Sequence, residues 1–129
     1  MPTRGDVTQF LGEFSAAITL GYEKWVPRPL VDRHQQLIDL GITQNLALKI
    51  IQDLGPDNYS GGPEPDDTKP ERSVWIFGAT VEGVEVYIKL ALQPHEKKSI
   101  TYGLIWSFHK AEFQMNYPLR KPQQGRKKR

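Results

Sequence analysis

The stretch "SVWIFGATVEGVEVYIKLALQPHEKKSITYGLIWSF", Ser73 to Phe108, decides the fold of this chain. It contains three runs rich in β-branched and aromatic residues, separated by turn signals at Glu82 and Gly83 and at residues 93–98. Both connections are short, so we expect the strands to form an antiparallel meander.

The first half of the chain carries helical patterns. We expect Asp6 to cap a first helix, because the apolar residues after it fall on one side of a 3.6-residue repeat. A second short helix should run from about Val31 to Gly41, and Thr43 should cap a third. The Gly- and Pro-rich residues 55–70 are expected to form one long loop.

Helices followed by strands predict the fold class. We expect an α+β domain in which N-terminal helices pack on one face of a small antiparallel β-sheet. One such domain should span residues 1–119, since the chain has the length of a single domain.

The composition excludes several function classes. The chain has no cysteine, which rules out disulfide frameworks, thiol nucleophiles and cysteine-ligated metals and suits a reducing cytoplasm. No apolar run approaches the ~18 residues of a membrane helix, and we expect no membrane partner. The three histidines are far apart and match no metal motif, so neither a metal nor a cofactor is expected.

The positive charge is concentrated at the C-terminus. The last ten residues hold six of the 17 Lys and Arg and no acid, so residues 1–119 have a formal charge of −4. This basic tail is expected to be disordered and to attract RNA phosphates; a solvated terminus without a role is the alternative. Its basic residues are Arg120, Lys121, Arg126, Lys127, Lys128 and Arg129.

Alternation along the last two strands predicts a polar cluster away from the core. In residues 84–92 the aliphatic side chains share one face, and Glu85, Tyr87, Lys89 and Ala91 share the other. In the last strand Tyr102, Leu104, Trp106 and Phe108 are expected on the core face, and Gly103, Ile105, Ser107 and His109 on the opposite face. Facing residues of antiparallel strands lie close together, so Tyr87, Lys89, Ser107 and His109 could meet there.

Such a cluster suits the cleavage of RNA without a metal. His109 can act as an acid or a base near neutral pH, and Lys89 can stabilise extra negative charge on a phosphate. Tyr87 can donate a proton, bind phosphate or stack on a base. The alternative is an ordinary half-exposed strand with a non-catalytic surface histidine.

Two motifs resemble a known family. "GVEVYIKL" (83–90) and "SFHKAEFQMNYP" (107–118), preceded by "DNYSGGPEPD" (57–66), are similar to the MqsR-like toxins of type II toxin–antitoxin pairs, within the RelE-like mRNA interferases. The resemblance implies a RelE-like fold and a metal-independent endoribonuclease that a cognate antitoxin protein neutralises. Its substrate would be RNA, with ribosome-associated mRNA as one form of it.

The resemblance also implies roles for single residues. Tyr87 matches the family's catalytic Tyr, and Lys89 matches the basic residue two places on. His109 occupies the place after "SF" where the regulator toxin has Lys, and Tyr87, Lys89 and His109 are the expected catalytic residues. Ser60 and Ile76 stand where the toxin has a catalytic Lys and Gln, which gives His109 a larger share of the chemistry. Supporting or substrate-binding residues would be Tyr59, Lys110, Glu112 and Tyr117. A non-catalytic module of the same fold that binds protein or nucleic acid is the alternative function.

Overall fold

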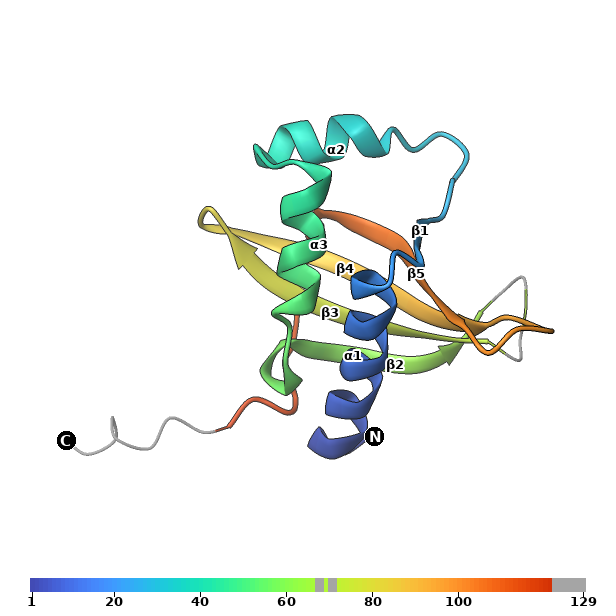
Figure 1. Cartoon of the computed structure of the whole chain (residues 1–129). Helices are drawn as coiled ribbons and strands as arrows, with labels where there is room; N and C mark the ends of the chain where they lie inside the picture. Colours follow the sequence, from blue (N-terminus) through green and yellow to red (C-terminus); the bar gives the residue numbers. More distant parts are fainter. Residues whose placement is uncertain (67–68, 70–71, 122–129) are drawn as a thin grey trace.

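The described residues form a five-stranded mixed sheet with helices on one face (Figure 1). The structure is a computed structural model that describes residues 1–66, 69 and 72–121. The strand order is β1-β5-β4-β3-β2; β1 is parallel to β5 and the other neighbours are antiparallel. The strands are β1 (Glu23–Trp25), β2 (Tyr59–Pro65), β3 (Ser73–Val81), β4 (Val84–Pro94) and β5 (Thr101–Lys110).

Each of the three α-helices in the described part of the chain begins after a residue whose side chain accepts a hydrogen bond from the backbone of the first turn. They are α1 (Arg4–Thr19), α2 (Arg33–Leu40) and α3 (Gln44–Gln52), and a short 3₁₀ turn, η1 (Pro56–Asn58), follows them. The predicted caps are confirmed for α2, which ends at the left-handed Gly41, and for α3, where the Thr43 side chain accepts from Leu46 N. The predicted cap of α1 is wrong: Thr3 is the N-cap, and Asp6 is its partner in a capping box.

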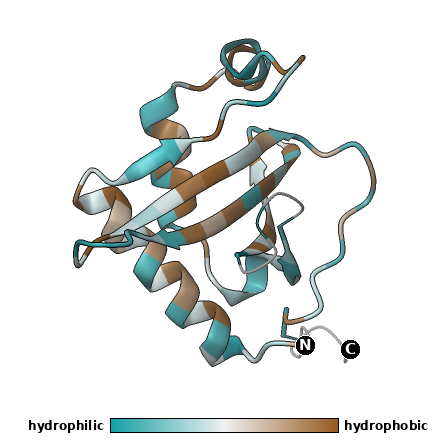
Figure 2. Cartoon of the chain, turned by 90° about the vertical axis from the view of Figure 1, so that its right-hand side faces the viewer, coloured by the Kyte–Doolittle hydropathy of each residue, from teal (hydrophilic) through white to brown (hydrophobic). Residues whose placement is uncertain are grey.

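The prediction of an α+β domain is confirmed at the level of class. Helices α1 and α3 cross the same face of the sheet (Figure 1), and hydrophobic segments alternate with hydrophilic ones along α1 (Figure 2). Buried residues of both helices belong to the core cluster that also contains residues of β3, β4 and β5. Phe14, Phe77 and Phe108 are fully buried between the two layers. Burying such a ring contributes roughly 1.5–3 kcal/mol, so this interface is the main source of stability.

Two strands were not predicted, and the sheet is not purely antiparallel. Residues 59–65 form β2 inside the segment expected to be a loop, with Tyr59 opposite Phe77 and Glu64 opposite Val74. Glu23–Trp25 form β1, whose parallel pairing with β5 makes the sheet mixed. Both are edge strands, where short length, Gly and Pro are tolerated because one side of the backbone needs no partner.

A β-bulge in β5 changes which side chains share a face. Lys89 pairs with Ser107 but Leu90 pairs with Ile105, so Trp106 is the extra residue. The alternation predicted along β5 therefore fails there. Ile105 joins the main core, whereas Trp106 lies with the apolar cluster of the opposite face.

The face opposite the helices, called the outer face below, has its own small apolar cluster. Val74, Ala91 and Leu104 are buried there, and Val26, Tyr102 and Trp106 pack against them. The expectation that Tyr102 and Leu104 belong to the main core is thus wrong. The placement of Gly103 on the outer face is also wrong, because a Cβ added to Gly103 would lie 3.1 Å from the ring of Phe14 in the main core.

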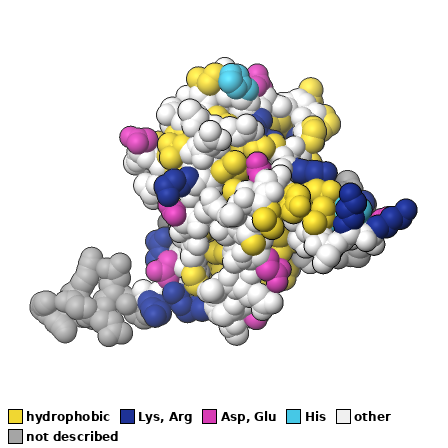
Figure 3. Space-filling model, viewed as in Figure 1, with side chains coloured by type: hydrophobic (Ala, Val, Ile, Leu, Met, Phe, Trp, Pro, Cys, Tyr) yellow, Lys and Arg dark blue, Asp and Glu magenta, His cyan; other side chains and the backbone are white. Residues whose placement is uncertain are grey.

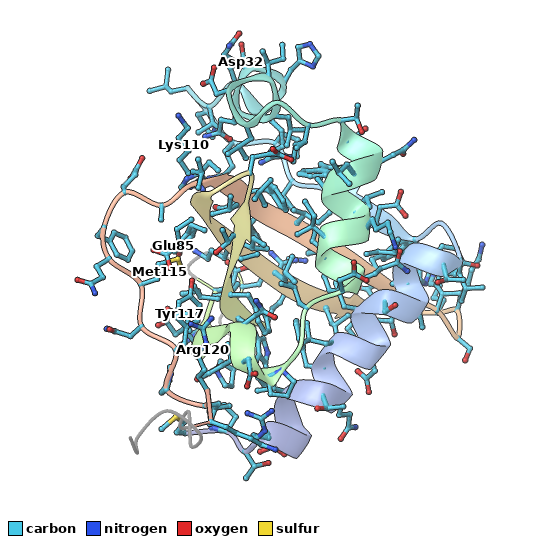
Figure 4. The ribbon with its side chains drawn as sticks, turned by 90° about the vertical axis from the view of Figure 1, so that its left-hand side faces the viewer. Asp32, Glu85, Lys110, Met115, Tyr117 and Arg120 are labelled. Atoms are coloured by element: carbon cyan, nitrogen blue, oxygen red, sulfur yellow. The ribbon has the colours of Figure 1, made fainter. Side chains whose placement is uncertain are left out.

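The segment after β5, residues 111–121, lies on the side of the sheet away from α1 and α3 (Figure 4). We call it the C-terminal strap. Met115 is buried, the Tyr117 hydroxyl donates to Glu85 Oε2 over 2.6 Å, and Leu119 accepts a hydrogen bond from Arg4. The strap therefore connects the outer face to the start of α1.

None of the helices in the described part of the chain is long and apolar enough to cross a membrane. Figure 3 views the helix-covered face, where Lys and Arg are scattered among acidic and hydrophobic side chains rather than joined in one patch.

Gly78→Ala should release the strap. Gly78 is buried in β3, and a Cβ there would clash with the Tyr117 hydroxyl and lie 2.9 Å from its Cε1. We expect the free energy of unfolding to fall by about 1–3 kcal/mol, measured by denaturant titration. Gly12→Ala is the control: it lies in α1 with nothing within 4 Å and should stabilise by about 0.5–1 kcal/mol. Equal stability of the two variants would contradict this account of the strap.

Candidate active site

The two polar pairs predicted on the outer face lie side by side. Tyr87 is opposite His109, and Lys89 is opposite Ser107. The rings of Tyr87 and His109 stack with centroids 5.3 Å apart and planes 19° from parallel. The predicted meeting of these four residues is confirmed, although the strict alternation used to predict it breaks at Trp106.

Tyr87 keeps its proton at neutral pH. Burial raises the pKa of its phenol, the charge of Glu64 raises it further, and the charge of Arg28 opposes both. Its hydroxyl makes no hydrogen bond to any described residue, so the phenol proton is available to a bound ligand.

The tautomer of the neutral His109 ring follows from the hydrogen bond that Nδ1 makes. Nδ1 lies 2.8 Å from the carbonyl oxygen of Lys110. A carbonyl can only accept, so the neutral ring carries its hydrogen on Nδ1 and a lone pair on Nε2. His109 therefore presents a base through Nε2 on the half-buried outer face.

Arg28 belongs to the site, and sequence reasoning missed it. It lies in the connection after β1, and its Nη1 donates to Ser107 Oγ over 2.9 Å. The parallel pairing of β1 with β5 brings this connection to Ser107. The only local signal is the pair of prolines around Arg28, which predicts an extended connection but not its neighbour.

A cavity of about 240 Å³ lies between Arg28, Lys89 and the neighbouring strand β2. Glu64, Pro65, Asp66, Val74 and Trp106 complete its lining. Asp66 is paired with Arg72 at 2.7 Å, so its charge is compensated. The cavity can therefore accept a polar group beside Tyr87 and His109.

The predicted supporting residues are not all near the site. Tyr59 is buried in the main core, where it packs edge-on against Phe77 and donates to the Gly62 carbonyl. Lys110 pairs with Val86, a core residue, and so lies on the opposite face from His109. Glu112 is exposed in the strap.

Tyr117 and Arg120 hold the strap in place. Arg120 lies over the Tyr117 ring at 4.1 Å and donates from Nε to the Asp57 carbonyl over 3.3 Å. Residue 120 thus contacts the domain rather than beginning a free tail, and Lys121 is exposed. The other tail residues, Arg126, Lys127, Lys128 and Arg129, lie outside the described residues.

Phe113 is a second feature that the sequence analysis did not single out. Its ring meets the Tyr87 ring edge-on, with centroids 6.0 Å apart, while 63% of the residue remains exposed. An exposed ring on a polar strap offers a surface on which a base can stack.

In the described ranges, no group of three or more His, Cys, Asp or Glu side chains is placed to hold a metal ion.

Searches of protein-family models, of curated proteins and of solved structures find no match to this chain.

Glu85→Gln should lower the pKa of Tyr117. Burial, the hydrogen bond to Glu85 and the Glu85 charge together raise this pKa to about 12. The stabilisation linked to this phenol is therefore complete below its ordinary value of about 10 and is lost as the pH rises toward the folded-state value. Ultraviolet difference titration of phenolate should show the fall in the Glu85→Gln variant and not in Glu13→Gln, which changes an exposed charge on α1. An unchanged titration would mean that Glu85 does not act on Tyr117.

Proposed function

We propose that this protein is a metal-independent endoribonuclease, an mRNA interferase toxin of a toxin–antitoxin pair. The observation that carries the proposal is the stacking of Tyr87 on His109, with Lys89 in the next cross-strand residue pair on the same face. The motif resemblance, which rests on the same two strands, points to the same function.

The chemistry needs a base, an acid and a cation at one phosphate. His109 Nε2 accepts the proton of the RNA 2′-hydroxyl as its oxygen attacks phosphorus. Tyr87 gives its proton to the 5′-oxygen as the phosphorus–oxygen bond breaks. Lys89 stabilises the negative charge that develops on the phosphorane. The products are a 2′,3′-cyclic phosphate and a free 5′-hydroxyl.

The hydrogen bond of the His109 ring and the raised pKa of Tyr87 support the acid and base assignments. His109 holds its hydrogen on Nδ1, which leaves Nε2 free to accept. The raised pKa of Tyr87 keeps the phenol protonated until the leaving oxygen needs the proton. Exposed Phe113 beside Tyr87 would stack on a base that flanks the cleaved bond.

The proposal includes a partner and a location. A cognate antitoxin would neutralise the toxin by binding it, and both would act in the cytoplasm, where the mRNA is. A degenerate toxin that binds without cleaving is the competing function, and it predicts RNA or protein binding that survives removal of the His109 side chain.

His109→Ala and Tyr87→Phe should each reduce RNA cleavage by about 10²- to 10⁴-fold, since each removes one proton-transfer group. The measurement is a cleavage assay in chelator with end-group analysis, which should find cyclic phosphate. In a host cell, expression of the wild-type chain should arrest growth and these variants should not.

His34→Ala is the matched control, because His34 is an exposed histidine on α2. It should cleave RNA and arrest growth like the wild type. If His109→Ala cleaves as well as this control, the assignment of the base is wrong. Cleavage that chelator abolishes would instead require a metal-dependent mechanism.

Removing residues 122–129 should weaken RNA binding and reduce its salt dependence. This deletion keeps Arg120 in place on Tyr117 and removes Arg126, Lys127, Lys128 and Arg129. For single-stranded RNA, the slope of log affinity against log salt should fall by about 0.7 for every phosphate that the shortened chain no longer neutralises. Fluorescence anisotropy at several salt concentrations measures this slope, and an unchanged value would show that the tail does not bind phosphate.

A further inference from the structure

The cavity next to the Tyr87 and His109 pair has the composition of an anion site. Arg28 and Lys89 line it, and Ser107 lies against Arg28. Neither Arg28 nor Lys89 forms an ion pair with another residue in the described part of the chain. Two cations therefore line the cavity without a described carboxylate paired to either.

The negative groups of the cavity do not cancel this charge. Asp66 is held by Arg72, whose Nη2 lies 2.7 Å from Oδ2, and Arg72 also donates to Gln93 over 2.6 Å. Glu64 is exposed on the edge strand β2. With Asp66 compensated, Arg28 and Lys89 face Glu64 alone in the cavity lining, which leaves an excess of positive charge.

A third cation adds to the potential. Arg33 donates to the carbonyls of Val26 and Trp106, and burial together with the like charge of Arg28 lowers its pKa. Arg28 and Arg33 thus lie close enough to repel each other. An anion bound in the cavity beside Arg28 would offset the repulsion between the two guanidinium groups.

The geometry of Arg28 leaves donors for a ligand. Its Nη1 donates to the neutral hydroxyl of Ser107, and the remaining N–H groups have no acceptor among the described residues. A guanidinium oriented by a hydroxyl keeps its full charge and its planar array of donors, which suits phosphate oxygens. Trp106, in the same lining, has a buried indole N–H that likewise lacks an acceptor in the described structure.

The spacing relates the cavity to the cleaved bond. Lys89 is two residues along β4 from Tyr87, about 7 Å in an extended strand. This separation is comparable to one step between phosphates along an RNA chain. The Tyr87–His109 pair therefore offers a position for the scissile phosphate, with Lys89 at its edge, and Arg28 with Ser107 offers a second position for the neighbouring phosphate.

We propose that Arg28 and Ser107, with Lys89 at the boundary, form a subsite for the RNA phosphate next to the scissile one. The inference rests on the proposed ribonuclease function for the identity of its ligand. The subsite would select RNA strands that extend beyond the cleaved bond and would set their register.

The first test measures phosphate binding without catalysis. Inorganic phosphate is titrated into the full chain, and the indole N–H signals of the three tryptophans are followed by NMR. We expect a saturable shift of the Trp106 signal that Arg28→Ala abolishes, Arg28→Lys retains in part and Lys49→Ala leaves intact. Lys49 is the control because it is an exposed cation on α3. No saturable shift, or the same shift in Arg28→Ala, overturns the subsite.

The second test uses substrates of defined length. A dinucleoside monophosphate holds only the scissile phosphate, and trinucleotides extended at the 5′ or the 3′ side hold one more. Arg28→Ala should raise KM for one of the two trinucleotides by about tenfold more than for the dinucleoside monophosphate, with little further change in kcat. An equal effect on all three substrates overturns the subsite.

The two hypotheses fail in different ways. Phosphate binding that depends on Arg28, without cleavage of any RNA by the wild type, keeps the anion site and rejects the ribonuclease. Cleavage by the wild type with no dependence on Arg28 keeps the ribonuclease and rejects the subsite.

Discussion

The register between β4 and β5 is the constraint on which the rest of this structure depends. The bulge at Trp106 lets β5 place Ile105 and Phe108 in the main core and still present Ser107 and His109 on the outer face. A regular strand could not do this, because residues of odd separation point to opposite faces. The same irregularity therefore serves the stability of the helix–sheet interface and the assembly of the polar site.

The outer face is divided into regions by what covers it. The C-terminal strap lies near Gly78 and Glu85 and is held by Tyr117, while the apolar cluster of Val74, Ala91 and Leu104 occupies the other end. Between them lie the two polar residue pairs, Tyr87 with His109 and Lys89 with Ser107, and the adjoining cavity. Partial burial from both sides lowers the local dielectric, which raises the pKa of Tyr87 and strengthens its interactions with charge.

The sequence by itself determined the fold class, two helix caps, the three long strands and the residues that could meet on the outer face. These features depend on local periodicity, turn chemistry and the pleat of neighbouring strands, all of which a single chain segment displays. Tyr87 and His109 could be paired in advance because a short connection joins their strands, so few registers compete. Strand β2 was missed because its glycines and prolines are typical of a loop.

Only the tertiary structure decided where Arg28, Tyr59 and Trp106 lie. Arg28 reaches Ser107 through the parallel β1, a pairing between segments about eighty residues apart, for which local sequence carries no signal. Tyr59 became a core residue because β2 adds to the edge of the sheet. Trp106 lies on the outer face because of the bulge in β5. Whether a bulge forms depends on how well the side chains of β5 pack both in the main core and in the apolar cluster of the outer face, and the main core exists only after the helices have packed on the sheet.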